Sequence, residues 1–224
     1  TPGTDSGPPF TWGETTLISG TLAFPVSDSQ ALFPLSLYLA AGGAIQDEQG
    51  RPVLDPAPLT LVLDFLLQAE QAGSLPYWIM QYETFDQCWE TFIQGEANQT
   101  LGWSSRYLPQ ATNQANGIEV TLLPTPTRSS FTLITGWVWA LPTTQPTRQS
   151  LSAQLAEHLV DSTFLVQWAA AAGYIPTRST DITAWSQPET RSLVEQIATG
   201  ARPYPPADVM LALAPVLKQA TLDV

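Results

Sequence analysis

The chain has 224 residues, of which 44% are hydrophobic and 12% are charged, so it can bury the core of one large domain or two small ones. The 20 acidic and 8 basic residues give a formal net charge of −12. Because the basic residues are scattered, the sequence argues against nucleic-acid binding, which depends on clustered Lys and Arg. A single cysteine, Cys88, excludes an internal disulfide and is too few for a zinc site. The longest apolar stretches, such as residues 32–45, are interrupted by proline, serine and glycine, and none approaches the roughly 20 residues that cross a bilayer.

Patterns of apolar residues, proline and glycine predict strands and helices that alternate along the chain. The predicted strands occupy residues 20–25, 97–105, 118–126 and 131–141. The predicted helices occupy residues 28–39, 55–73, 84–95, 150–173 with a break at 161–163, 186–200 and 206–224. This alternation indicates an α/β architecture.

The predicted helix ends carry local signals. Asp55 is the expected N-cap of the second helix, with Pro56 at its first position. Thr84 is the expected cap of the third helix, and Gly173 fits the position after the fourth, where a left-handed conformation is common. Pro215 lies inside the last predicted helix and could kink it.

Little of the chemistry that common enzymes need is present. The only histidine, His158, lies inside an amphipathic helix, and nucleophile-elbow, phosphate-loop and H-E-x-x-H motifs are absent from the sequence. Two facing carboxylates could still hydrolyse a glycoside, and Glu83, Asp86 and Glu96 have no cap or turn role. Their separation in sequence does not place them across a cleft. We therefore expect a binding protein without catalytic residues, cofactor or metal, and a glycosidase is kept as an alternative.

Four of the eight tryptophans are expected to pack within the protein. Trp89 and Trp168 lie on apolar faces of predicted helices, which is typical of core residues. Trp185 precedes a helix start, where it can pack as a hydrophobic staple, and Trp12 is expected at the domain edge.

Other aromatic residues lie in predicted loops and at strand ends, where α/β proteins contact ligands. These are Trp78 and Tyr82 in the PYWIMQY segment, Trp103 after Gly102, and Trp137 and Trp139 after Gly136. An exposed ring there can stack on a sugar, and Ser104, Arg106 and Tyr107 beside Trp103 can bond its hydroxyl groups. In a regular strand the indoles of Trp137 and Trp139 would share one face.

Several short motifs follow one another along the chain. They are P-x-T-W-x-E at 9–14, G-G at 42–43, a D-x-x-G turn before a D-P helix start, F-x-x-G-E-A at 92–97, G-W-S-S, V-T-L-L-P, T-G-W-V-W-A-L-P, and G-Y-I-P-T-R at 173–178. In this order they resemble the family 1 extracellular solute-binding proteins of ABC importers, and the resemblance spans nearly the whole chain.

The resemblance implies a type II periplasmic-binding-protein-like fold, with two lobes that close around a sugar. Members are usually near twice this length, so the chain looks like a C-terminal portion, mainly the second lobe plus the hinge-crossing segment, which as a fragment could be classed α+β. Residues 1–130 would form the second-lobe core, and residues 131–178 a hinge strand and helix pair packed on the first lobe. Residues 179–224 would return to the second lobe. An exposed apolar surface, and dimerisation through it, would follow.

The resemblance also implies an extracytoplasmic protein, periplasmic or lipid-anchored, that delivers a carbohydrate to ABC permease subunits. Trp103 matches an aromatic residue that often stacks on sugar, and Gly136-Trp137 matches a strand end that lines the cleft. Tyr174 and Arg178 fall in a turn that is close to the cleft in some members and structural in others. Trp139 is expected to pack against a lobe. The same fold could instead bind a peptide, a polyamine or a polyol.

Overall fold

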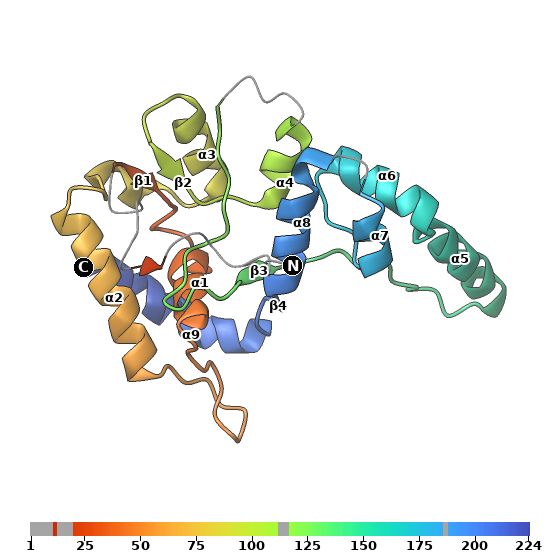
Figure 1. The fold of residues 1–224 in the computed structure, drawn as a ribbon. Coiled ribbons are helices and arrows are strands. Elements are labelled where there is room, and N and C mark those ends of the chain that lie inside the picture. Colours follow the sequence, from red (N-terminus) through yellow and green to blue (C-terminus); the bar gives the residue numbers. More distant parts are fainter. Residues whose placement is uncertain (1–10, 13–19, 112–116, 186–187) are drawn as a thin grey trace. The chain divides into compact units, whose positions relative to one another are not determined.

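A computed structural model describes residues 11–12, 20–111, 117–185 and 188–224 (Figure 1). The chain divides into two compact units, which we treat separately. Unit 1 contains Thr1–Gly102, Thr121–Leu133 and Thr199–Val224, and unit 2 contains Trp103–Val120 and Ile134–Ala198. The assignment of residues 1–130, 131–178 and 179–224 to lobes stays a prediction.

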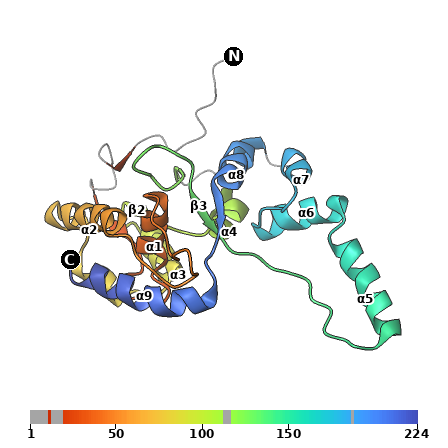
Figure 2. The same ribbon diagram turned by 90° about the horizontal axis from the view of Figure 1, so that it is seen from below.

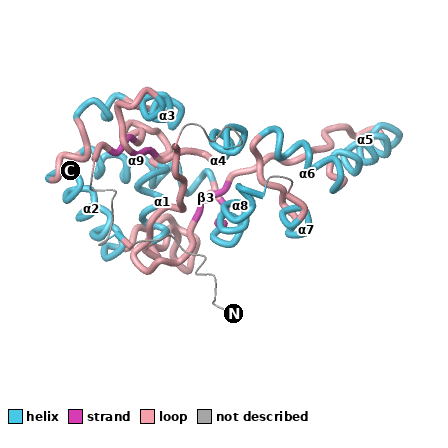
Figure 3. The backbone as a smooth tube through the Cα atoms, turned by 45° about the horizontal axis from the view of Figure 1, so that its top comes forward, coloured by secondary structure: helices cyan, strands magenta, loops and turns pink. Residues whose placement is uncertain are grey.

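Unit 1 combines short strands with longer helices. Its elements are β1 (Leu22–Ala23), α1 (Leu32–Ala40), α2 (Pro56–Gln71), the 3-10 helix η3 (Tyr77–Gln81), α3 (Phe85–Ile93), β2 (Gln99–Thr100), β4 (Ala201–Pro203) and α9 (Ala207–Leu222). β1 pairs in parallel with β2, and β4 pairs with β3 (Thr132–Ile134) in a second two-stranded sheet. Helix and loop prevail over strand in the described part of the chain (Figure 3).

The central element of unit 1 is α1, which is buried on all sides. Its seven consecutive residues from Leu32 to Tyr38 are buried, as expected for a helix that is apolar all round. Phe33 and Leu37 belong to a cluster with Phe65 of α2, whereas Leu35 packs with Met210 and other residues of α9. Accordingly α1 lies beside both α2 and α9 (Figure 2). Trp12 is a buried member of the first cluster rather than, as predicted, a residue at the domain edge, and its indole N–H donates to the Pro124 carbonyl at 2.7 Å.

Two helix starts in unit 1 match their predicted caps only in part. Thr84 and Gln87 form a capping box at the start of α3, which confirms the predicted cap. Pro56 occupies the first turn of α2 as predicted, but the Asp55 carboxylate makes no cap. It accepts a hydrogen bond from the Ala44 N–H at 2.8 Å instead, so Asp55 is the N-cap residue as predicted but without a capping bond from its side chain.

The first helix starts four residues later than predicted, at Leu32. Ala31 has a left-handed backbone with φ of 49°, which a continuous helix cannot contain. The Asp28 carboxylate accepts hydrogen bonds from the N–H groups of Gln30 and Leu32 at 3.0 and 2.9 Å. Asp28 therefore organises a turn ahead of the helix.

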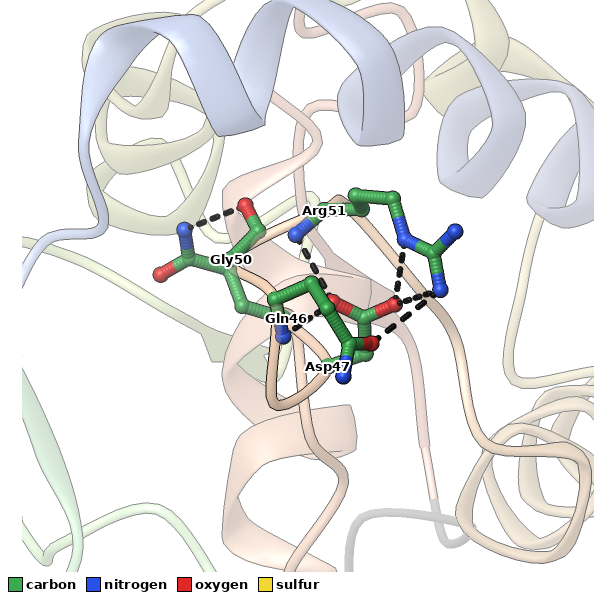
Figure 4. Close-up of polar contacts among 5 residues, drawn as sticks. Gln46, Asp47, Gly50 and Arg51 are labelled. Atoms are coloured by element: carbon green, nitrogen blue, oxygen red, sulfur yellow. Dashed lines mark hydrogen bonds and ion pairs between the residues drawn. The ribbon is translucent and has the colours of Figure 1, made fainter.

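The polar turn between α1 and α2 is tied together by its own side chains (Figure 4). The Asp47 carboxylate accepts from the N–H groups of Gln49 and Arg51, both at 2.9 Å, and from the Arg51 guanidinium at 2.7 Å. The Gln46 amide donates to the Gly50 carbonyl at 3.0 Å. These bonds hold the pKa of Asp47 below its usual value, chiefly through the Arg51 side chain.

Unit 2 is helical. Its helices are α4 (Ser104–Tyr107), α5 (Pro146–Leu159), α6 (Ser162–Ala172), α7 (Ser179–Thr183) and most of α8 (Pro188–Gly200). The predicted break between α5 and α6 is confirmed, because the Asp161 carboxylate caps α6 by accepting from Thr163 and Phe164. Ser186, the predicted start of the next helix, lies outside the described residues.

The buried core of unit 2 joins α6 to the segments on either side of it. Leu108, Ala169, Ala170, Trp185 and Val194 form this cluster, with Tyr107 packed against it. The fully buried Trp185 donates from its indole nitrogen to Thr190 Oγ1 at 2.8 Å.

All four predicted strands are wrong in extent. The strand predicted at 20–25 is limited to Leu22–Ala23, and the strand predicted at 97–105 is limited to Gln99–Thr100, since α4 already begins at Ser104. Residues 118–126 form no strand in the described structure, and the strand predicted at 131–141 is limited to Thr132–Ile134. Its partner β4 has only three residues, and the nearby Pro205 and Pro206 have no N–H to extend the ladder. The β-forming residues at 131–141 therefore have no partner strand of equal length to pair with.

Candidate functional site

The predicted site residues that follow β2 lie on and beside the short helix α4. Trp103 is the residue before the helix, and its side chain is half-buried, as are those of Ser104 and Tyr107. Arg106 is exposed. Tyr107 and the buried Leu108 pack into the core of unit 2, and this packing holds α4 and its polar and aromatic side chains in position.

Gly173 brings a second predicted site residue, Tyr174, close to α4. This glycine is buried and ends α6 in a left-handed conformation, with φ of 76° and ψ of 19°. A Cβ atom on it would lie 2.7 Å from Pro109 Cγ and 2.8 Å from the Ser105 carbonyl oxygen. The chain after α6, which begins with Tyr174, therefore starts in direct contact with the backbone of α4.

Tyr174 forms an aromatic pair with Trp168 of α6. The ring centroids are 5.6 Å apart and the ring planes differ by 11°. The two residues are 37% and 45% exposed, so a stacked pair of rings is available to a ligand.

The prediction that Trp168 belongs to the core is wrong. The buried face of α6 is formed by Val166, Ala169 and Ala170, at helical spacing, and Trp168 lies between these positions on another face. Ala169 and Ala170 are smaller and less hydrophobic than tryptophan, so the sequence pattern favoured Trp168 as the core residue, although the alanines make the core contacts. Trp168 is the residue of this site that sequence reasoning missed. It lies two residues before the buried Ala170, a spacing that puts the two side chains on different faces of the helix.

Arg178 holds neighbouring backbone segments together. Its guanidinium donates to the Val160 carbonyl at 2.6 Å and to Ser162 Oγ at 3.4 Å, and it lies 3.9 Å from the buried Asp181 carboxylate. Arg178 thus ties the junction between α5 and α6 to the first turn of α7. These contacts give Arg178 a structural role, and its contact with a ligand stays a prediction.

Trp78 and Tyr82 belong to unit 1, on and after η3. Their ring centroids are 5.5 Å apart, and both pack against a cluster that contains Ala23 and Cys88. The Tyr82 hydroxyl forms a hydrogen bond with Thr91 Oγ1 at 2.7 Å. These contacts anchor η3 to α3, and a ligand role for the pair stays a prediction.

The segment after β3 is exposed. Trp137 is 83% exposed and Trp139 is 63% exposed, and Gly136 has open space around it. Because residues 137–139 form no strand, the arrangement of both indoles on one strand face is not present. Trp139 was expected to pack more deeply than Trp137, and within this chain neither indole is buried.

The reactive groups of the described residues are few. No group of three or more His, Cys, Asp or Glu side chains in the described ranges could hold a metal ion. Burial raises the pKa of the Cys88 thiol to about 12, so this cysteine is a poor nucleophile. No described helix is both long and apolar enough to cross a membrane.

The fold is that of periplasmic binding proteins. The chain is similar to T. maritima MalE3 with maltose bound (TM-score 0.66, 16% identity), covering 91% of this chain and 55% of that one. It is also similar to the cyclic α-maltosyl-1,6-maltose binding protein from Arthrobacter globiformis (TM-score 0.66, 19% identity), covering 97% and 60%. The chain thus spans a little over half the length of these solved structures. This likeness confirms the predicted periplasmic-binding-protein-like fold.

The sequence model of the family described as bacterial extracellular solute-binding protein matches residues 6–187. The chain belongs to this family, and the resemblance drawn from the motif order is confirmed. Membership indicates an extracytoplasmic location, and the family consists of binding proteins rather than enzymes. A comparison with curated proteins gives no match.

Proposed function

We propose that this chain forms part of a solute-binding protein that binds a carbohydrate outside the cytoplasmic membrane and delivers it to an ABC permease. Support comes from the family and from the sugars bound by the two structurally similar proteins. The observation that carries the proposal is the half-exposed Trp168–Tyr174 pair, whose turn contacts the backbone of α4.

This arrangement has the chemistry that sugar recognition needs. Flat aromatic faces can cover the C–H face of a pyranose ring, while hydroxyl and guanidinium groups bond its hydroxyl groups. The Ser104, Arg106 and Tyr107 side chains supply such groups from α4. Because Tyr107 is packed against the core, the site needs little reordering when the ligand binds.

The proposal is tested by following tryptophan indole NMR signals while maltose and a panel of mono- and oligosaccharides are added. We expect the signal of Trp168, assigned with a Trp168→Phe variant, to shift in a saturable way even when affinity is only millimolar. The fully buried Trp185 provides the internal reference. Removal of the indole in Trp168→Ala should weaken binding about tenfold, which corresponds to ~1.4 kcal/mol.

A negative result would also be informative. If no sugar moves the Trp168 signal at tens of millimolar, the carbohydrate site is wrong. If a peptide, polyamine or polyol moves it when sugars do not, the site stands and the ligand class changes. Tyr77→Ala serves as the control, because its ring is 85% exposed and Tyr77 is not one of the predicted site residues, so this change should leave binding unchanged.

We further propose that helix α5 contacts a part of the periplasmic-binding fold that this chain does not supply. None of its 14 residues is buried, and Leu151 and Leu155, one turn apart, are 67% and 58% exposed. Support for a covering lobe comes from the share of the similar structures, 55% and 60%, that the chain spans.

A further inference from the structure

We propose that Gly173 is a positioning residue of the candidate site, which fixes the Trp168–Tyr174 pair against α4. This inference rests on the proposed carbohydrate function for its biological meaning. Its structural basis is that Gly173 meets two separate requirements, one on backbone conformation and one on space.

The first requirement is the left-handed backbone at the end of α6. At φ of 76° the chain reverses, and the Tyr174 N–H donates to the Ala169 carbonyl at 2.9 Å. This reversal allows the ring of Tyr174 to stack on Trp168, which lies in the preceding turns of the same helix. Residues with a Cβ atom adopt this conformation at a cost, and asparagine adopts it more readily than alanine.

The second requirement is the absence of a side chain. The two nearest obstacles to a Cβ atom are the ring of Pro109 and the carbonyl oxygen of Ser105. Neither is the end of a flexible side chain that could turn aside. Any larger residue at 173 must therefore change the contact between this turn and α4, and with it the position of the aromatic pair relative to Trp103, Arg106 and Tyr107.

Another helix of the protein provides a matched control. Gly73 follows α2 with φ of +74°, nearly the same as at Gly173, but a Cβ atom there meets nothing within 4 Å. Gly73 therefore has only the conformational requirement. A comparison of identical substitutions at 73 and 173 separates the cost of the backbone conformation from the effect of the contact with α4.

The experiment compares Gly173→Asn with Gly73→Asn, and Gly173→Ala with Gly73→Ala. We expect the substitutions at 173 to shift the indole signals of Trp168 and Trp103 in the ligand-free protein and to weaken maltose binding at least tenfold. The substitutions at 73 should leave both unchanged, although both alanine variants should unfold at lower temperature. The asparagine pair keeps the test decisive if the alanine variant at 173 does not fold.

The outcomes separate this inference from the proposed function. If the wild-type chain binds no sugar but the indole signals shift only in the variants at 173, the positioning role stands and the carbohydrate function fails. If the Asn variants at 73 and 173 give the same indole spectra and the same affinity as the wild type, the positioning role is wrong.

Discussion

Trp168 and Trp185 belong to the same unit, and their side chains have opposite environments. Trp185 is fully buried and hydrogen-bonded, so truncation to alanine would leave a large cavity and remove the hydrogen bond to Thr190. We expect Trp185→Ala to lower the free energy of unfolding by about 3–5 kcal/mol. Trp168→Ala should cost about 1 kcal/mol or less, because nearly half of the residue is already exposed.

Urea unfolding of both variants, followed by circular dichroism, measures this difference. Trp89→Ala is a useful third variant, since Trp89 is 7% exposed and was correctly predicted as a core residue. Equal losses for Trp168→Ala and Trp185→Ala would contradict the surface role of Trp168.

The two core predictions, for Trp89 and Trp168, had different outcomes for a physical reason. Trp89 lies in α3 one position after the buried Cys88, and bulky residues define the buried face there. In α6 the core face is made of alanines, which approach neighbouring segments closely and leave the larger indole outside. Residue hydrophobicity alone could not distinguish these cases, because the packing partner decides which face is buried.

At the scale of elements, helix ends were more predictable than strand lengths. The cap at Thr84, the break at residues 161–163 and the left-handed Gly173 depend on neighbours within a few residues, so their signals are local. Strand length depends on a partner far away in sequence. Because β4 has only three residues, it limits the length of β3, even though residues 135–141 have a high β propensity.

In the predicted site too, contacts between sequence neighbours were predictable and contacts between distant segments were not. The sequence placed Trp103 and Tyr107 beside one another because they are neighbours on α4, and it nominated Tyr174 from a separate motif. The contact of α4 with Gly173 joins these segments, and it depends on tertiary packing that no spacing rule contains.

Helix α9 contains an element-level test at Pro215. This residue lies in the helix interior, where it has no N–H to bond the carbonyl four residues earlier, at Leu211. Leu211 is 81% exposed, so this side of the helix faces solvent, and the helix continues through Pro215. We expect Pro215→Ala to raise the free energy of unfolding by about 1–2 kcal/mol, less than the full interior-proline penalty because the unfolded chain also gains freedom.

The matched control for this prediction is Pro56→Ala at the start of α2. Pro56 occupies a first-turn position, where the N–H has no helical partner, so its replacement should be neutral or slightly destabilising. Thermal unfolding midpoints of the two variants provide the measurement. A gain from Pro56→Ala that equals the gain from Pro215→Ala would refute the hydrogen-bond explanation.

At the scale of the whole molecule, we expect the exposed apolar side chains of α5 and of residues 137–141 to promote self-association. A surface of this kind favours association with a second copy. We expect sedimentation velocity to show concentration-dependent dimers of this chain. The double variant Leu151→Glu/Leu155→Glu should remain monomeric at concentrations where the wild type associates.

The control for association is Leu61→Glu/Leu67→Glu in α2, which removes two exposed leucines from unit 1. These changes should leave the dimer intact. A wild-type chain that stays monomeric at high concentration would refute the expected dimer and weaken the proposed covering role of another lobe.

Alkaline pH should also destabilise the whole molecule. Burial raises the pKa of Cys88 from 9.0 to about 12, and it raises the pKa values of Tyr38 and Tyr204 above 10.0. As the pH rises above about 9, the unfolded chain releases these protons before the folded chain does, so the free energy of unfolding falls. Urea midpoints between pH 7 and 11 measure the fall, and Cys88→Ala should move its onset towards pH 10. A constant midpoint across this range would contradict the prediction.

The buried thiol of Cys88 has a practical consequence for fluorescent labelling. At neutral pH only on the order of one such thiol in 10⁵ is ionised, so maleimide dyes should react with it very slowly in the folded protein. A single cysteine introduced at an exposed position, for example by Tyr77→Cys at a residue 85% exposed, would be the only reactive group. The native protein is therefore already suited to carry one dye at a chosen position, without a cysteine-free background that would disturb the packing around α3.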